Sequence, residues 1–131
     1  MIAVVDASVA LGTILGVPDA VERFAAVEEA HAPQFLVLET INALRGLRRS
    51  GVVEAEAAEI GIQLLHELPV TLWDHRPTID AVWARRDELT AYDAAYLVTA
   101  EALGAHLVTA DRGLARRGRA ALGRERVVHV T

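Results

Sequence analysis

The sequence predicts an α/β domain with a mainly parallel central sheet. Short, wholly apolar runs recur along the chain, and segments whose apolar residues have helical spacing separate each run from the next. Strands that are buried on both faces have such continuous apolar runs, and parallel strands need helical crossovers between them. With 131 residues, 53% of them hydrophobic, the chain is long enough for one domain with a sizeable core, which we expect to span residues 1–131.

The N-terminal half begins with the first predicted strand, the apolar run of residues 2–5. This strand ends in Asp6-Ala-Ser8, which leads into a helix. Pro18 starts a second helical segment, which continues to about Glu29 before Pro33 breaks the helical pattern. Ser50-Gly51 closes the first of two amphipathic helices that follow, expected over residues 36–49 and 54–67.

The C-terminal half alternates strands and helices in the same way. Pro69 leads into one apolar run and Gly104 ends the last long helix, which are typical positions for these residues. The expected strands cover residues 70–73, 106–109 and 126–130. The expected helices cover residues 78–88, 91–103 and 111–118.

The composition excludes several classes of chemistry. The chain contains no cysteine, which excludes disulfides, thiolate metal sites and cysteine nucleophiles. All 13 basic residues are arginine, so Schiff-base chemistry and a phosphate-binding P-loop lysine are excluded as well. No apolar run approaches the ~20 residues that span a bilayer, and the N-terminus has no signal-peptide pattern. We therefore expect a cytoplasmic protein.

The charges are distributed unevenly along the chain. Residues 1–111 hold 17 of the 18 acidic residues, whereas residues 112–131 hold six arginines and a single acid, Glu125. A basic segment on an acidic protein can bind a polyanion while an acidic pocket elsewhere holds cations. A solvated, arginine-rich helix explains the basic segment equally well.

Two acids follow predicted strands, where parallel sheets gather their ligands. Asp6 comes directly after the first strand, and Asp111 lies two residues beyond Thr109 at the end of another. Both also precede helices, so either could simply cap a helix N-terminus. Asp74 is a third acid at a strand end, and its position near Pro77 favours a role in a turn.

Two further acids lie near helix starts. Glu39 falls among apolar residues in the early turns of its helix, where a carboxylate needs a partner, and Asn42 one turn later could orient it or a water. The alternative for Glu39 is a favourable charge near a helix N-terminus. Asp93 lies three residues after Thr90, which also fits a capping box.

The joint pattern points to a cation site. Two carboxylates ~4 Å apart repel by about 4 kcal/mol at an effective dielectric of 20, so four converging acids need a compensating charge. Oxygen-only sites suit Mg²⁺ or Mn²⁺, and these ions activate water and neutralise phosphoryl transition states.

Four segments resemble, in order and spacing, the motifs of PIN-domain ribonucleases, and the likeness is greatest to the VapC toxins of bacterial toxin–antitoxin pairs. These segments are Val4-Val-Asp6-Ala-Ser-Val9, Glu39-Thr-Ile-Asn42-Ala-Leu44, Thr90-Ala-Tyr-Asp93-Ala-Ala-Tyr-Leu97 and Leu107-Val-Thr-Ala-Asp111-Arg-Gly-Leu114. The resemblance implies a PIN-like three-layer α/β/α domain. It also implies a Mg²⁺- or Mn²⁺-dependent endoribonuclease that is a homodimer and is inhibited by an antitoxin protein.

The resemblance also implies roles for individual residues. The catalytic acids would be Asp6, Glu39, Asp93 and Asp111, with Asp6 and Asp93 first among the metal ligands and Asp111 as a third. Ser8, Asn42 and Thr109 would support these acids. The mechanism would be in-line hydrolysis of RNA by a metal-activated water, leaving a 5′-phosphate and a 3′-hydroxyl. The arginines expected to hold RNA, tRNA among the possible substrates, are Arg45, Arg48, Arg49, Arg112 and Arg116, with Arg117 and Arg119 in the same basic segment.

Three other functions share parts of this pattern. A haloacid-dehalogenase-type phosphatase needs a second aspartate where Ser8 stands, and a lysine that the chain lacks. A zinc hydrolase needs clustered histidines, whereas the five histidines are scattered. The third alternative, a non-catalytic module that binds RNA or an antitoxin on the same fold, remains open.

Overall fold

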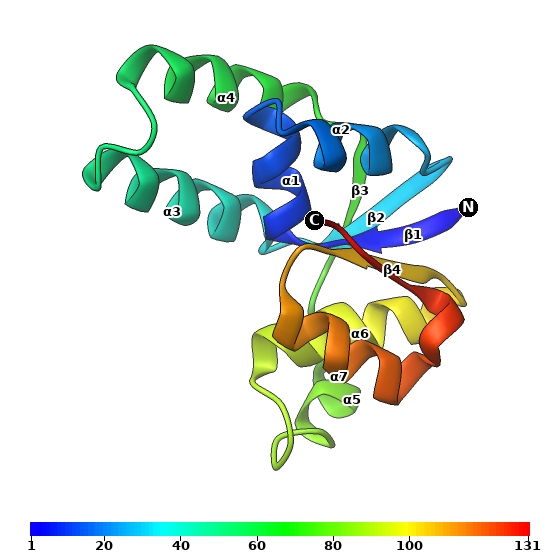
Figure 1. Cartoon of the computed structure of the whole chain (residues 1–131). Helices are drawn as coiled ribbons and strands as arrows, with labels where there is room; N and C mark the ends of the chain where they lie inside the picture. The colour runs from blue at the N-terminus through cyan, green and yellow to red at the C-terminus, as the bar shows by residue number, and fades with distance from the viewer.

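A five-stranded parallel sheet forms the centre of the protein, whose computed structural model describes residues 1–131 (Figure 1). The strand order is β3-β2-β1-β4-β5, so the chain runs outward from β1 to β3, crosses back to β4 on the other side of β1, and continues outward to β5. The strands are β1 (Ile2–Val5), β2 (Glu29–Pro33), β3 (Val70–Trp73), β4 (His106–Thr109) and β5 (Val127–His129). The predicted parallel α/β fold is confirmed.

Helices cover both faces of the sheet (Figure 1). The first face carries α1 (Ala7–Ile14) and α2 (Pro18–Ala25), and α3 (Leu36–Arg49) and α4 (Ala55–Glu67) project beside them as an antiparallel arm. The second face carries α5 (Ile79–Trp83), α6 (Ala91–Leu103) and α7 (Arg112–Leu122). Two single turns of 3₁₀ helix, Arg76–Thr78 and Arg124–Arg126, precede α5 and β5.

Alternate residues of the central strands build two separate cores. Val4 and Leu107 are fully buried against α6 and α7, where Leu97 and Leu114 meet them. Val5 and Val108 point to the opposite face and pack against α1. Gly118 lets α7 approach closely, because a β-carbon there would lie 2.8 Å from the Leu107 side chain.

The structure departs from the sequence prediction at five places. The helix expected to reach Glu29 ends at Ala25, and the segment interpreted as a helix break is β2, a strand between β1 and β3. The helix expected over residues 78–88 is only the five-residue α5, followed by turns. The last helix continues to Leu122 rather than ending near residue 118, and β5 covers 127–129 within the expected 126–130.

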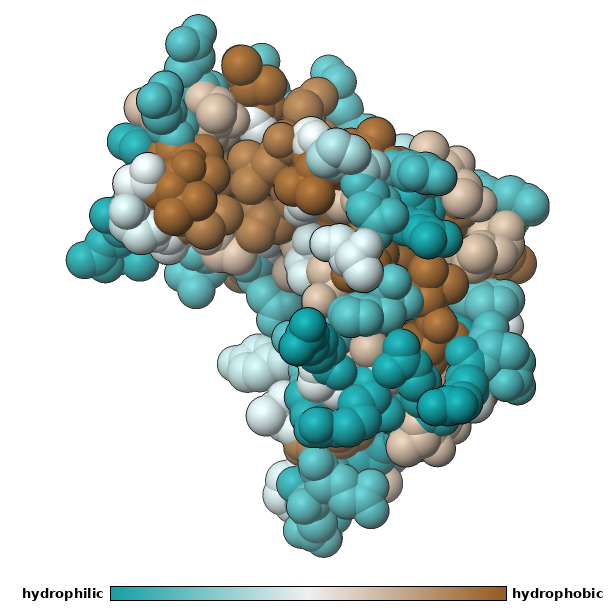
Figure 2. All heavy atoms as spheres, in the orientation of Figure 1, coloured by the Kyte–Doolittle hydropathy of each residue, from teal (hydrophilic) through white to brown (hydrophobic).

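The exposed surface is polar over α7 and apolar over the arm (Figure 2). The arm exposes a group of large apolar side chains, which are Leu38, Ile41, Ile60 and Leu64. A cavity of about 340 Å³ lies at the base of the arm, between α3, α4 and β3. No helix is both long enough and apolar enough to cross a membrane.

Candidate active site

Asp6 is the buried centre of the candidate site. It follows β1 directly and caps α1, since its Oδ1 accepts a hydrogen bond from the backbone N–H of Val9 at 3.2 Å. Ser8 donates from Oγ to the same oxygen at 2.6 Å, and Thr109 donates from Oγ1 to Oδ2 at 2.6 Å. The side chain of Asp6 is therefore held by residues at the carboxyl ends of β1 and β4, and only 4% of the residue is exposed.

The two hydroxyls that hold Asp6 have a fixed hydrogen-bonding direction. Ser8 Oγ accepts from the backbone N–H of Ala110 at 2.8 Å, and Thr109 Oγ1 accepts from that of Asp111 at 3.0 Å. Each hydroxyl thus accepts a hydrogen bond from a backbone N–H and donates a hydrogen bond to the carboxylate. Burial nevertheless raises the pKa of Asp6 to about 6, although these hydrogen bonds act in the opposite direction.

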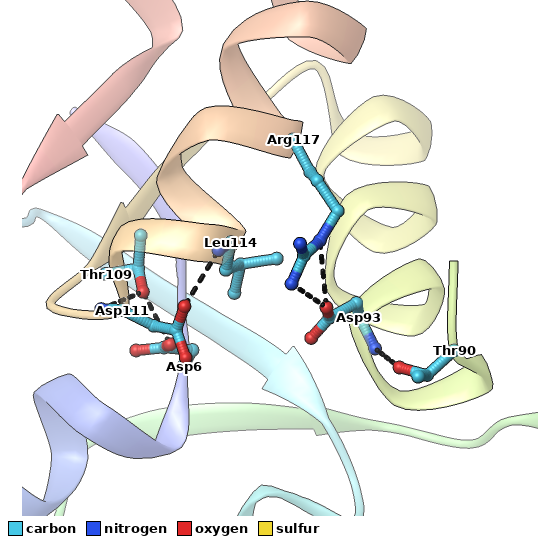
Figure 3. Close-up of polar contacts among 7 residues, drawn as sticks. All are labelled: Asp6, Thr90, Asp93, Thr109, Asp111, Leu114 and Arg117. Carbon is cyan, nitrogen blue, oxygen red and sulfur yellow. Dashed lines mark hydrogen bonds and ion pairs between the residues drawn. The ribbon is translucent and has the colours of Figure 1, made fainter. Parts of the chain in front are cut away.

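Asp111 and Asp93 lie on either side of the first turn of α7 (Figure 3). Asp111 caps α7 by accepting from the N–H of Leu114 at 2.8 Å with Oδ1. Asp93 lies in the first turn of α6, where Thr90 caps the helix by accepting from the Asp93 N–H at 3.2 Å. The capping interpretations of Asp6 and Asp111 are therefore correct. At α6, Thr90 caps the helix, but the Asp93 carboxylate binds Arg117 and does not complete a capping box with the Thr90 N–H.

Arg117 forms an ion pair with Asp93. Its Nε and Nη2 donate to Asp93 Oδ2 at 3.1 and 2.7 Å, joining α7 to α6 (Figure 3). The sequence placed Arg117 with the arginines that could flank a pocket, but here it neutralises a site acid. Since both side chains remain partly exposed, at 35% and 26%, the pair contributes little to stability and chiefly orients Asp93.

Glu39 joins the site from α3 through a hydrogen bond that sequence reasoning missed. The phenol of Tyr96, on α6, donates to Glu39 Oε1 at 2.8 Å. Burial raises the pKa of Glu39, the bond from Tyr96 opposes that shift, and the charges of Asp93 and Asp111 raise it further. Glu39 therefore lies within electrostatic range of both acids. The signal in the sequence was the spacing, because Tyr96 comes three residues after Asp93 on the same helix face.

The carboxylate oxygens that accept no hydrogen bond determine which ligand the site can bind. Glu39 Oε2, Asp93 Oδ1 and Asp111 Oδ2 receive no hydrogen bond from the protein, while the other oxygen of each carboxylate does. No three acidic or histidine side chains lie close enough to form a ready-made metal cluster. Repulsion among unneutralised carboxylates favours such spacing. Both oxygens of Asp6 already accept hydrogen bonds, with Oδ2 accepting only one, from Thr109. The donor set, with oxygen ligands only and one uncommitted oxygen on each of the other three acids, fits Mg²⁺ or Mn²⁺.

The other residues named from the sequence are distributed as follows. Asn42 is exposed and makes no hydrogen bond to Glu39. Arg112 and Arg116 are exposed on α7 next to Asp111. Arg45, Arg48 and Arg49 are also exposed but lie farther along α3, the last about 15 Å from Glu39 at 1.5 Å rise per residue. Asp74 pairs with Arg76 at 2.6 Å in a turn, which lowers its pKa to about 2 and confirms the turn role.

Replacing Tyr96 by phenylalanine is expected to raise the pKa of Glu39. The substitution removes a bond that stabilises the carboxylate, whereas the ring can keep its edge-to-face contact with Phe35, 5.2 Å between centroids. The free energy of unfolding should fall by about 0.5–1.5 kcal/mol. Carboxyl-carbon NMR titration of Glu39 measures the pKa. Tyr92→Phe, which alters an exposed phenol, is the control. An unchanged Glu39 pKa would mean that the hydrogen bond does not form in solution.

Comparison with known proteins identifies the family. The model of the PIN domain family matches residues 3–120, and the chain belongs to this family. Ribonuclease VapC9 of Mycobacterium tuberculosis is 37% identical over 117 residues, which cover 89% of this chain and 91% of the relative. Ribonuclease VapC12 of the same organism is 34% identical over 116 residues, covering 86% and 89%. The chain is thus a VapC-type PIN-domain protein.

A solved structure supports the same fold. The crystal structure of PAE2754 from Pyrobaculum aerophilum superposes with a TM-score of 0.70 at 25% sequence identity, covering 95% of this chain and 85% of that one. The PIN-like three-layer arrangement that the sequence motifs implied is therefore confirmed. The roles of the individual acids and arginines stay predictions.

Proposed function

We propose that this protein is an endoribonuclease that hydrolyses RNA phosphodiester bonds with the help of Mg²⁺ or Mn²⁺. The relatives named as ribonucleases support the coarser assignment, a nuclease of the hydrolase class. The finer assignment, a metal-dependent endoribonuclease, is supported by the carboxylate oxygens of Glu39, Asp93 and Asp111 that accept no hydrogen bond, together with the buried Asp6. The products we propose are a 5′-phosphate and a 3′-hydroxyl.

Asp6, Asp93 and Asp111 are the residues that would hold the cation. When bound, it would supply the positive charge that makes a water nucleophilic at neutral pH and offsets the charge of the phosphoryl transition state. Ser8 and Thr109 keep the Asp6 carboxylate in one orientation. Glu39, with its raised pKa, is suited to accept a proton from an attacking water. Arg112 and Arg116 are suited to hold flanking phosphates.

The experiment is cleavage of total bacterial RNA, including tRNA, by the purified protein with Mg²⁺ or Mn²⁺. Discrete cuts should appear with either ion and disappear with EDTA. Asp93→Asn should abolish them, whereas Asp87→Asn, which alters an exposed acid outside the site, should not. Mapping of the product ends tests the proposed chemistry.

Two results would contradict the proposal. Cutting that persists in EDTA, or in Asp93→Asn, would mean that the acids do not act through a cation. An absence of cutting by a folded protein that still binds RNA would favour the alternative function, a non-catalytic module on the same fold.

The partners we propose are an antitoxin protein and a second copy of the chain. The exposed apolar side chains of the arm give such partners a surface to cover (Figure 2). Co-expression with any small protein that is encoded next to this chain, followed by light scattering of the purified complex and of the free protein, tests both. A neighbouring protein that neither binds nor inhibits would exclude the antitoxin partner, and a monomeric free protein would exclude the homodimer.

A further inference from the structure

An open aromatic cleft lies near the start of α6, and the proposed function does not use it. It has a volume of about 620 Å³ and lies between the 3₁₀ turn at Arg76–Thr78, α5 and the start of α6. Its walls carry four ring-bearing residues and one cation, which are Phe35, His75, Trp83, Tyr92 and Arg86. This is an unusual concentration for a chain in which only 5% of residues are aromatic.

The rings form flat, accessible faces rather than a closed core. Phe35 lies at the base and contacts His75 and Tyr92 at centroid distances of 5.4 and 5.5 Å. Trp83 and Tyr92 line the opening and remain 65% and 64% exposed. The guanidinium carbon of Arg86 lies 4.5 Å from the centroid of the Trp83 ring. A planar ring that entered this cleft would therefore find aromatic faces together with a positive charge.

Two residues of the cleft link it to the acids, although no acid lines the cleft itself. Tyr92 immediately precedes Asp93 in the chain. Phe35 contacts Tyr96 at 5.2 Å, and the phenol of Tyr96 holds Glu39. A ligand that filled the cleft would thus touch the sequence neighbour of Asp93 and a ring in contact with the partner of Glu39, and we propose that these two carboxylates act on a phosphodiester. The ligand that combines a planar ring with such a phosphodiester is a nucleotide.

We infer that this cleft binds one unpaired base of the RNA substrate, next to the bond that is cut. The inference deepens the proposed function and rests on it. Unpaired bases are recognised by stacking on aromatic side chains and by hydrogen bonds to their edges. Trp83 and Tyr92 supply the stacking faces, and His75 and Arg86 supply polar groups at the wall. Helical regions, whose bases are already stacked and paired, are excluded, so the cleft selects single-stranded segments.

Binding of short RNA without cleavage tests the inference. Fluorescence anisotropy in EDTA would compare labelled single-stranded homo-oligomers of adenosine, cytidine and uridine with an abasic oligomer of the same length. The proteins are the wild type, Trp83→Ala, Trp83→Phe and Trp73→Ala. Trp73 is a matched control, because it is 44% exposed and lies on the edge strand β3 outside the cleft. Circular dichroism confirms that each variant is folded.

Trp83→Ala should weaken the binding of at least one base-containing oligomer by about tenfold, and Trp83→Phe should restore most of it. The abasic oligomer should bind more weakly, and its affinity should not depend on residue 83. Trp73→Ala should bind every oligomer within about twofold of the wild type. Equal affinities for Trp83→Ala and Trp73→Ala would overturn the inference. It would also be overturned if Trp83→Ala changed only the dimerisation of the protein, since the cleft would then be covered by a second copy.

A parallel cleavage assay separates this inference from the proposed function. If wild-type protein stacks bases in the cleft but cuts no RNA with Mg²⁺ or Mn²⁺, the base site stands and the nuclease assignment fails. If Trp83→Ala cuts the same bonds at the same rates as wild type, the nuclease assignment stands and the base site fails.

Discussion

Asp6→Asn should reduce metal-dependent RNA cleavage by about a thousandfold. This corresponds to about 4 kcal/mol of transition-state stabilisation, a cost expected when a cation loses a charged ligand. The substitution changes few atoms but removes the negative charge at the buried centre of the site. Asp93, Asp111 and Glu39 lie on other elements, and none of their carboxylates can take the place of the Asp6 carboxylate.

Hydrogen bonding at Asp6 makes the substitution more damaging than the loss of charge alone. Ser8 and Thr109 both donate to the carboxylate, and each is already committed to accept from a backbone N–H. An amide offers one acceptor oxygen and one donor nitrogen, so one hydroxyl would face a donor. Correcting that mismatch requires a rearranged network at a cost of about 1–3 kcal/mol.

Single-turnover cleavage of one RNA, with Mg²⁺ at several concentrations, is the measurement. Asp74→Asn is the matched control, because Asp74 also follows a strand but pairs with Arg76 on the surface. It should cut like the wild type. If Asp6→Asn retained more than about a tenth of the wild-type rate at saturating Mg²⁺, Asp6 could not be a metal ligand.

The sequence predicted the positions of the acids because they depend on local structure. Asp6 and Asp111 follow apolar strands and cap helices, and both features can be read within a few residues of each acid. Parallel strands then place their carboxyl ends at one edge of the sheet. Convergence of Asp6 and Asp111 follows from topology, so it requires no knowledge of side-chain contacts.

The missed features all depend on distant residues. The segment of β2, Glu29-Ala-His-Ala-Pro33, has no apolar run, since alanines fill the buried positions. It becomes a strand because β1 and β3 pair with it on both sides. The bonds from Tyr96 to Glu39 and from Arg117 to Asp93 span 57 and 24 residues. Tyr96 lies on the same helix face as Asp93 and Arg117 belongs to the basic segment, but only the folded chain shows that Glu39 and Asp93 are their partners.

The free energy of unfolding in EDTA should increase as the pH falls from 7.5 to 5. Burial raises the pKa of Asp6 from 3.8 to about 6, so between these values the folded protein binds a proton that the unfolded chain does not. The stabilisation from this group is complete below 3.8 and is lost as the pH rises through 6. The full contribution of Asp6 to the free energy of unfolding is ~3 kcal/mol, and on the order of 1 kcal/mol of it is gained between pH 7.5 and pH 5.

Other shifted acids do not reverse this trend in that range. The raised pKa of Glu39 acts in the same direction. Asp19 and Asp74 have lowered pKa values, so the stability they contribute is lost only as the pH falls below about 4. Urea unfolding at a series of pH values above 4.5 therefore reports chiefly on the acids of the site.

Two comparisons identify Asp6 as the source of the pH dependence. Asp6→Asn cannot titrate at that position, so its stability should change much less between pH 7.5 and 5. Saturating Mg²⁺ should reverse the trend in the wild type, because a bound cation favours the ionised carboxylate and stabilises the folded protein most at pH 7.5. The opposite result would be a free energy of unfolding in EDTA that falls steadily as the pH is lowered from 7.5 to 5. The pKa of Asp6 would then not be raised, and the positive charge that the cation is proposed to supply would have to come from the protein itself.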